Sequence, residues 1–240
     1  MNKQIVKILF ACFTVFVFCS ENGLNNDRNK SAVNALVVGS VEIQSLVTGI
    51  DGTATGEIIK LNDLDSILVK LGYDDIPVEW CYTEDGQFSF YIEKFDKDWH
   101  WLDADFCWGV HKKSSITNHM GDDMNTASYF EKIILPPDNE GTSRFKPYIG
   151  PYPNPFTGST KFRYALTDTM HEVKMRIWSY RDKKFAEFTK LDSLPGMYEV
   201  DWDGKDTEGI DCPPGVYIAY FECRDFRNYG HSFYQTVVKE

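Results

Sequence analysis

Residues able to do acid–base, nucleophilic or metal chemistry are scattered along this chain rather than gathered into a motif. The five histidines show neither an HExxH arrangement nor a paired spacing typical of a metal site. No serine lies in a G-x-S-x-G elbow, and no glycine-rich phosphate loop occurs. A glycosidase would need two carboxylates at a set separation across a cleft, and nothing in the sequence fixes such a separation. The candidate carboxylates, which we assign to a solvated face, are Asp103, Asp105, Asp122 and Asp123. We therefore expect no catalytic residue, no metal site and no cofactor in a protein that is not an enzyme.

A second acidic cluster, formed by Asp201, Asp203 and Asp206, superficially resembles a calcium loop. EF-type loops place carboxylates at alternate positions before a glycine, and Gly204 comes too early for that pattern. A tight turn explains the same residues, because aspartate side chains bond their own backbone and glycines permit sharp bends at Gly204 and Gly209. We favour the turn.

One aromatic cluster has the potential to bind a ligand. Trp99, Trp101 and Trp108 lie close together in the sequence around Phe106. Trp99 and Trp101 would share one face of a strand, where exposed rings can stack on sugars or peptides. Large aromatic side chains in a small sandwich usually fill its core, however, and we favour that interpretation.

The six cysteines allow a limited set of disulfides. Cys12 and Cys19 fall in an expected leader, and the remaining four permit three connectivities. If the chain between Cys212 and Cys223 is an extended strand, its ends lie about 30 Å apart, far beyond the reach of a disulfide. Cys81 and Cys107 lie on separate expected strands of one domain, so we expect that pair to be close enough to bridge.

The N-terminal segment is typical of an export signal. Lys3 and Lys7 precede an apolar run that is too short to span a bilayer comfortably and is followed by polar residues. We therefore expect a signal peptide over residues 1–19 and a flexible tether over residues 20–32. Two alternatives stay open at Cys19: ordinary cleavage nearby, or a lipoprotein signal in which its thiol is acylated.

Composition narrows the partners and the fold class. The net charge of −11, without a basic stripe, is unfavourable for nucleic acid, and we expect none to bind. The hydrophobic content of 42%, with 15% aromatic residues, is ample for packed cores and favours β structure. The length suits two small domains, which we place at residues 33–136 and 147–240 on either side of a polar, Pro- and Gly-bearing linker over residues 137–146.

Short alternating strands with Gly and Pro at each bend fill the second of these domains. Phe162, Tyr164 and Leu166 alternate with polar or small residues, which is the period of a half-buried strand. The same alternation recurs over residues 173–177, 198–202 and 216–220, and residues 233–238 can supply a last strand. This spacing indicates a β-sandwich.

These strands also carry a resemblance to a known family. The shared residues, in order, are Asn154, Pro155, Phe156, Gly196, Trp202, Asp203, Gly204, Asp206, Gly209, Pro213, Gly215, Val216 and Tyr217. In type, order and spacing they resemble the Ig-like domain named after the flagellar-hook capping protein, which is close to the type A C-terminal sorting domain of type IX secretion cargo. The resemblance implies an Ig-like sandwich over residues 147–240 that engages outer-membrane secretion or sorting machinery.

The first domain has one clear local signal. Val78, Trp80 and Tyr82 alternate up to an Asp-Gly turn at residues 85 and 86, after which Phe88 and Phe90 alternate back. Asp-Gly between alternating strands predicts a β-hairpin. The stretch resembles part of the carboxypeptidase-regulatory-like, transthyretin-type sandwiches, which implies a β-sandwich class. Apolar residues at helical spacing over residues 62–71 predict a short helix or a connection.

Together these features predict an all-β protein of two small Ig-like β-sandwich domains in tandem after a signal peptide. We expect a non-enzymatic bacterial protein at the cell surface or outside the cell, whose C-terminal domain serves sorting or attachment. The N-terminal domain would then be a passenger for adhesion or for binding a glycan or surface protein. The alternatives are a lipid-anchored envelope protein with a purely structural Ig-like domain, and a carbohydrate-binding module.

Overall fold

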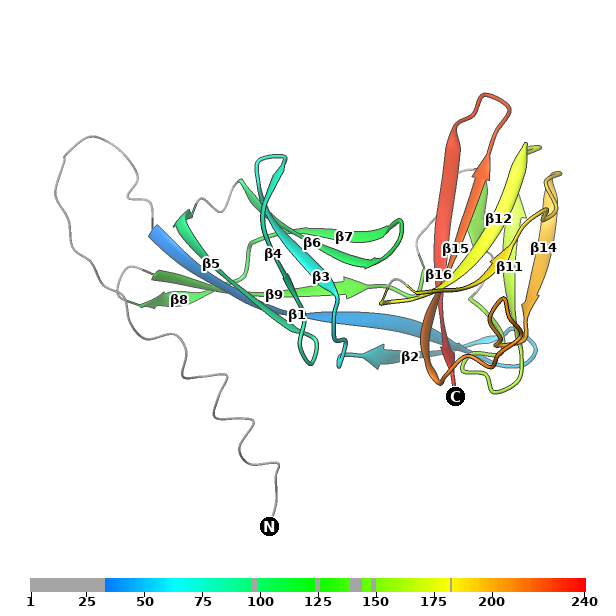
Figure 1. The fold of residues 1–240 in the computed structure, drawn as a ribbon, viewed down its shortest axis with the longest axis horizontal. Helices are drawn as coiled ribbons and strands as arrows, with labels where there is room; N and C mark the ends of the chain where they lie inside the picture. Colours follow the sequence, from blue (N-terminus) through cyan, green and yellow to red (C-terminus); the bar gives the residue numbers. More distant parts are fainter. Residues whose placement is uncertain (1–32, 96–98, 124–125, 139–143, 148–149, 182) are drawn as a thin grey trace, which may run out of the picture. The chain divides into compact units, whose positions relative to one another are not determined.

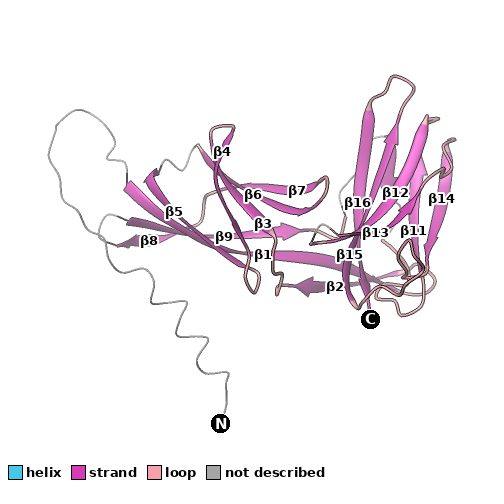
Figure 2. Cartoon of the chain, viewed as in Figure 1, coloured by secondary structure: helices cyan, strands magenta, loops and turns pink. Residues whose placement is uncertain are grey.

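The computed structural model describes residues 33–95, 99–123, 126–138, 144–147, 150–181 and 183–240, and within these ranges it contains strands and loops but no helix (Figure 2). Because no helix occurs there, none is long and apolar enough to cross a membrane. This confirms the predicted all-β class. The expected signal peptide, Cys19 and the tether over residues 20–32 lie outside the described residues.

Two sheets form the N-terminal sandwich (Figure 1). One contains β1 (Val33–Thr48), β2 (Ala54–Leu61), β5 (Gln87–Phe95), β8 (His119–Asp123) and β9 (Thr126–Leu135), in the order β2-β1-β9-β8 with β5 also paired to β1. The other contains β3 (Leu68–Tyr73), β4 (Ile76–Tyr82), β6 (His100–Cys107) and β7 (Val110–Ser115), in the order β4-β3-β6-β7. Alternate residues such as Val37, Val69, Phe90 and Leu102 fill the space between the two sheets.

The predicted hairpin around Asp85 and Gly86 is half right. Both residues have positive φ, and Glu84 and Gln87 exchange backbone hydrogen bonds, so the tight turn is present. The two flanking strands, however, pair with different partners: β4 pairs with β3, and β5 pairs with β1. The turn therefore carries the chain from one sheet to the other, a difference that local turn chemistry does not encode.

The helix predicted over residues 62–71 is wrong, and the alternative of a connection holds for its first part. Leu64 and Ile67 are buried in a loop, and β3 starts at Leu68. The buried Thr83 hydroxyl holds this loop, since it accepts a hydrogen bond from the Ile67 amide at 3.0 Å and donates one to the Leu64 carbonyl. A loop that buries two leucine-sized side chains before an alternating strand produces the same apolar spacing as a helix.

A second pair of sheets forms the C-terminal sandwich. One has the order β10-β11-β14, with bounds Phe145–Pro147, Thr160–Leu166 and Gly196–Trp202. The other has the order β13-β12-β15-β16, with bounds Lys184–Phe188, Glu172–Ser179, Gly215–Arg224 and Gly230–Lys239. The strands predicted from alternation over residues 160–238 are therefore present.

Strand β15 is buried on both faces. Tyr217, Ala219 and Phe221 face the core of the C-terminal sandwich. Val216 and Ile218, together with Tyr234 of β16, belong instead to the core cluster of the N-terminal sandwich. The apolar face over residues 216–220 that the sequence indicates therefore packs against the other sandwich.

Residues Ala32–Glu240 form one compact unit. Within this unit, part of the expected linker pairs with β16. The Pro137 carbonyl accepts a hydrogen bond from the Thr236 amide at 2.8 Å, and Asp138 forms an antiparallel β-bridge with Gln235. Division into two separable domains at residues 137–146 stays a prediction.

Candidate functional site

The outer side of sheet β4-β3-β6-β7 carries an unusual set of side chains for a solvent-facing sheet. Direct strand partners share a face, so the register places Trp80, Lys70, Asp103 and Lys113 in one row and Tyr82, Leu68, Asp105 and His111 in the next. Gly72 and Trp101 form the row beyond them. We call these ten residues the aromatic face.

Two large aromatic residues of this face are largely exposed to solvent. Trp80 is 68% exposed and Tyr82 is 62% exposed, both on β4 at the edge of the sheet. Leaving such a side chain in water forgoes about 1.5–3 kcal/mol of burial. Clustered exposure of this kind marks a binding surface more often than scattered single residues do.

Trp101 is held rigidly at one end of the face. A Cβ on Gly72 would lie 1.9 Å from the indole ring, so the absence of a side chain there lets the ring lie against β3. The indole N–H donates a hydrogen bond to the Asp74 carbonyl at 2.5 Å, and the Lys113 ammonium lies 3.9 Å from the ring centroid.

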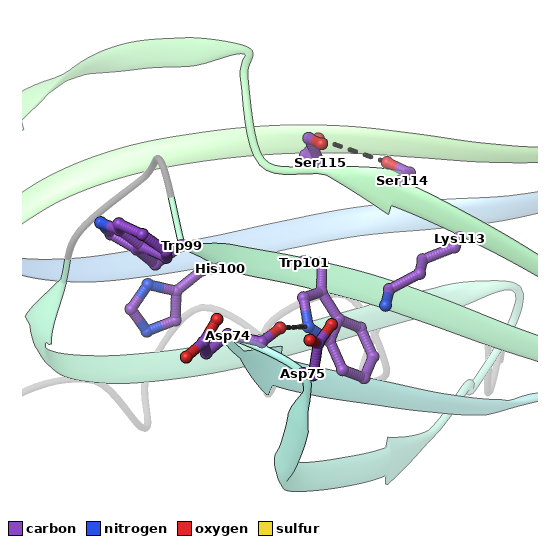
Figure 3. Close-up of a pocket in the computed structure, with 8 residues that line it drawn as sticks. All are labelled: Asp74, Asp75, Trp99, His100, Trp101, Lys113, Ser114 and Ser115. Carbon is purple, nitrogen blue, oxygen red and sulfur yellow. Dashed lines mark hydrogen bonds between the residues drawn. The ribbon is translucent and has the colours of Figure 1, made fainter.

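A shallow pocket of about 280 Å³ adjoins Trp101 (Figure 3). It is lined by Asp74, Asp75, Trp99, His100, Trp101, Lys113, Ser114 and Ser115. Trp99 precedes β6 in a turn and is 52% exposed. The pocket thus combines exposed indole surface with carboxylate, ammonium and hydroxyl groups, and it opens at the edge of the aromatic face.

Trp108 lies at the opposite end of β6 and is 50% exposed. Its ring stacks on Trp178 with centroids 6.1 Å apart, meets Tyr220 edge-on at 5.6 Å, and has the Arg176 guanidinium 5.1 Å away. The prediction that Trp99, Trp101 and Trp108 fill the core is therefore wrong, because the core between the sheets is occupied by Leu102, Phe106 and other alternate residues.

Charged groups of both signs lie on the sheet between Trp101 and Trp108. Lys70 Nζ is 3.5 Å from Asp105 Oδ2, and His111 Nδ1 is 3.6 Å from Asp105 Oδ1 and 3.8 Å from Asp103 Oδ1. Asp103 Oδ1 is buried and accepts no hydrogen bond from any residue that the structure describes. This oxygen is therefore out of reach of a ligand, whereas the Asp103 side chain as a whole keeps 20% exposure in the centre of the face.

The other carboxylates proposed for a glycosidase pair are not part of this arrangement. Asp122 lies on β8 in the opposite sheet, where its carboxylate is 2.9 Å from His119 Nε2. Asp103 and Asp105 are two residues apart on one strand, which gives no cleft between them. Among the residues that the structure describes, no three His, Cys, Asp or Glu side chains are grouped to hold a metal ion.

Sequence reasoning missed the exposure of Trp80 and Tyr82. Both residues alternate with Cys81, so they share one face of β4. Which face of β4 is exposed depends on its pairing with β3, because β5 pairs with β1 in the other sheet and not with β4. Local alternation therefore places the two rings on one face without showing that this face is open.

The expected bridge between Cys81 and Cys107 is absent from the structure, in which both are free cysteines. Strand β3 lies between their strands, with Cys81 opposite Val69 and Val69 opposite Ala104. Two strand spacings separate the backbones by about 10 Å, beyond the Cα distance of about 7 Å that a disulfide tolerates. Burial raises the pKa of Cys212 to about 11 and that of Cys223 to about 12, so both of these thiols are protonated and poorly reactive.

The residues that carry the family resemblance play structural roles. Asn154 is fully buried, and Phe156 packs on Trp202 with ring centroids 5.3 Å apart. Tyr217 packs edge-on against Trp202 at 5.1 Å, and its hydroxyl donates a hydrogen bond to the Pro213 carbonyl at 2.5 Å. Gly196 and Gly215 begin β14 and β15.

The Asp203–Gly209 segment is a turn whose carboxylates are engaged by backbone amides. Asp203 accepts from Lys205 at 3.1 Å, and Asp206 accepts from Glu208 and Ile210 at 2.9 Å each. Gly204 has a φ of +72°, and a Cβ there would lie 2.7 Å from the Lys239 side chain. These hydrogen bonds from backbone amides to aspartate side chains are the ones expected of a tight turn.

A polar network on the C-terminal sandwich gives a pH-dependent prediction. Glu199 accepts hydrogen bonds from the Tyr152 hydroxyl at 2.6 Å and from Arg163 Nε at 2.8 Å, and these lower its pKa from 4.5 to about 2. The contribution to stability is present above the ordinary pKa and is lost as pH falls from about 4.5 towards 2. We expect Glu199→Gln to flatten the acid limb of a plot of melting temperature against pH in that window. An acid limb identical to that of the unaltered chain would contradict this assignment.

No family model matches the chain, and no curated protein matches it. Among solved structures, FlgD from P. aeruginosa is 22% identical, with a TM-score of 0.29, over 32% of this chain and 60% of that chain. FlgD from Xanthomonas campestris is 20% identical, with a TM-score of 0.30, over 41% of this chain and 68% of that one. Latent PorU from Porphyromonas gingivalis is 15% identical, with a TM-score of 0.34, over 80% of this chain and 17% of the PorU chain. All three likenesses are distant, and they carry no argument about the family or the function of this chain.

Proposed function

We propose that this is an exported, non-catalytic bacterial protein that binds a ligand at the cell surface or outside the cell through the aromatic face. The observation that carries the proposal is the exposure of Trp80 and Tyr82 beside the charged centre of the same face. Trp80 pairs in register with Lys70, and Tyr82 pairs with Leu68. A ligand that covers both rings therefore also contacts the neighbouring strand β3.

The arrangement suits binding better than chemistry. The carboxylates Asp103 and Asp105 lie side by side and make contacts with Lys70 and His111. A flat face with aromatic anchors and a polar rim resembles a recognition surface, where a few anchors supply most of the affinity.

Replacing both exposed anchors tests the proposal. We expect the Trp80→Ala/Tyr82→Ala variant to lose binding to intact cells or surface extract by about tenfold or more, because each anchor contributes on the order of 1 kcal/mol or above. Both side chains are solvent-exposed, so the melting temperature should change little. Binding of purified chain to cells, measured by co-sedimentation, provides the readout.

Tyr91→Ala is the matched control, because Tyr91 is 51% exposed on β5 in the opposite sheet. It should bind like the unaltered chain. Equal binding by the double variant and the unaltered chain would remove the aromatic face as the binding surface.

We further propose that residues 147–240 serve delivery to the outer surface through secretion or sorting machinery. This rests on the resemblance of the motif from Asn154 to Tyr217 and on the leader expected over residues 1–19. The alternative is a protein anchored in the envelope through an acylated Cys19, with a purely structural Ig-like domain.

A reporter fusion separates these alternatives. We expect a signal peptide and neutral reporter fused to residues 144–240 to reach the surface in a host with the matching machinery, as measured by protease accessibility. The same reporter fused to residues 33–136 should remain in the periplasm. Because Val216 and Ile218 lose their cover in the first fusion, its folding is checked by circular dichroism. Retention of the folded fusion in the periplasm, with an acylated Cys19 in the full chain, would favour the anchored protein.

A further inference from the structure

We infer that the ligand of the aromatic face is an uncharged saccharide chain that lies along β6 between Trp101 and Trp108. The inference rests on the proposed binding function and adds the chemical class of the ligand and its path across the sheet. Three features of the face carry it: the balance of its charges, the partly exposed carboxylate of Asp103 at its centre and the placement of its aromatic rings.

The charges of the face match hydroxyl groups better than ions. Asp103 and Asp105 only accept hydrogen bonds, whereas Lys70 and Lys113 only donate them. An anionic ligand would lie against the two carboxylates, and a cationic ligand would lie against the two ammonium groups. A hydroxyl both donates and accepts, so a row of sugar hydroxyls can satisfy the alternating groups without a net charge.

The Asp103 carboxylate gives a specific point of contact. Its Oδ1 is buried and accepts no hydrogen bond from any described residue, but the side chain as a whole is 20% exposed, so a ligand can reach the exposed part of the carboxylate. Its partner in register, Lys113, extends towards the Trp101 ring (Figure 3). A sugar hydroxyl bound between Asp103 and Lys113 would donate to the first and accept from the second.

The aromatic rings define a track. Trp101 lies near the start of β6, and Trp108 lies in the turn that follows β6, where it lines a pocket together with Asp105 and His111 of the aromatic face. Trp80 and Tyr82 flank the centre of this track, two strand spacings from β6 across the sheet. The exposed rings offer apolar surface for the C–H faces of sugar rings, while the centre offers polar groups for their hydroxyls.

The test uses a surface extract from the producing cells, divided into samples treated with proteinase, with mild periodate, or left untreated. Periodate cleaves vicinal diols of sugars and leaves the peptide backbone intact. We expect binding of the purified chain to survive proteinase and to be lost after periodate. The binding material should pass through an anion exchanger, and high salt should change its affinity little.

Two carboxamide variants sharpen the result. Asp103→Asn should weaken binding to the proteinase-treated, unretained polysaccharide by about tenfold. Asp122→Asn on the opposite sheet should leave that affinity unchanged. An equal affinity for the unaltered chain and Asp103→Asn would overturn the placement of the saccharide over Asp103.

The outcomes distinguish the inference from the proposed function. Binding that depends on Trp80 and Tyr82 but is destroyed by proteinase and survives periodate would overturn the saccharide and leave the aromatic face as a protein-binding surface. Retention of all binding polysaccharide on the anion exchanger would overturn the uncharged class. Binding indifferent to Trp80 and Tyr82 would overturn the proposed function and the inference together.

Discussion

Replacing Asn154 by alanine is expected to lower the free energy of unfolding by about 3–5 kcal/mol, since several buried groups lose their partners at once. The Asn154 amide donates to Ser45 Oγ at 2.9 Å and to the Leu46 carbonyl, and its oxygen accepts from the Val238 amide at 2.8 Å. One side chain thus joins β1, the loop before β11 and β16. Urea denaturation followed by tryptophan fluorescence measures the loss.

A double-mutant cycle with Ser45→Ala isolates the contact. The Ser45 hydroxyl also donates to the Thr236 carbonyl at 3.1 Å, so both side chains belong to one network. We expect the two substitutions to be less than additive, with a coupling of about 0.5–3 kcal/mol. Strict additivity, or a cost for Asn154→Ala below about 1 kcal/mol, would show that Asn154 does not hold these strands together.

Trp202→Ala should cost about 3–5 kcal/mol, because a large buried ring is removed from the core of the C-terminal sandwich. Trp202 is 1% exposed and packs between Phe156 and Tyr217. Its indole N–H also donates to the Lys205 carbonyl at 2.8 Å, which ties the strand to the following turn. The melting temperature and the unfolding midpoint in urea should both fall.

Two further variants separate the ring from its hydrogen bond and from its strand. Trp202→Phe keeps an aromatic ring and should recover part of the loss, with the remainder reflecting the lost N–H bond and the smaller volume. Met197→Ala, at an exposed position of the same strand, should change stability by less than about 0.5 kcal/mol. A Trp202→Ala variant as stable as Met197→Ala would contradict the assigned core.

Local patterns in the sequence predicted most strands of this fold and the chemistry of its turns. Phe162, Tyr164 and Leu166 alternate as expected and are buried, and Asp206 caps its turn as expected. These features depend on neighbours within a few residues. The pairing of β4 with β3 and of β5 with β1 depends on distant partners, which is why an Asp-Gly turn predicted a hairpin that does not form.

The candidate site was predicted only in part, for the same physical reason. Trp101 and Trp108 could be recognised as aromatic residues able to bind a ligand, but whether they were exposed depended on which elements cover β6. Val216 and Ile218 show the opposite case. They lie on the outer face of a C-terminal strand, and the N-terminal sandwich covers that face. The exposure of Trp80 and Tyr82 likewise depends on the pairing of β4 with β3 at the edge of its sheet.

Footprinting with hydroxyl radicals is the measurement that tests the binding surface most directly. The purified chain is labelled alone and when saturated with surface extract of the producing cells, and modification is read at each aromatic residue by mass spectrometry. We expect severalfold protection of Trp80 and Tyr82, with unchanged labelling of Tyr91 and Phe226, which are 51% and 71% exposed. Unchanged labelling of Trp80 and Tyr82 in the bound chain, with protection at Tyr91 or Phe226, would contradict binding through the aromatic face.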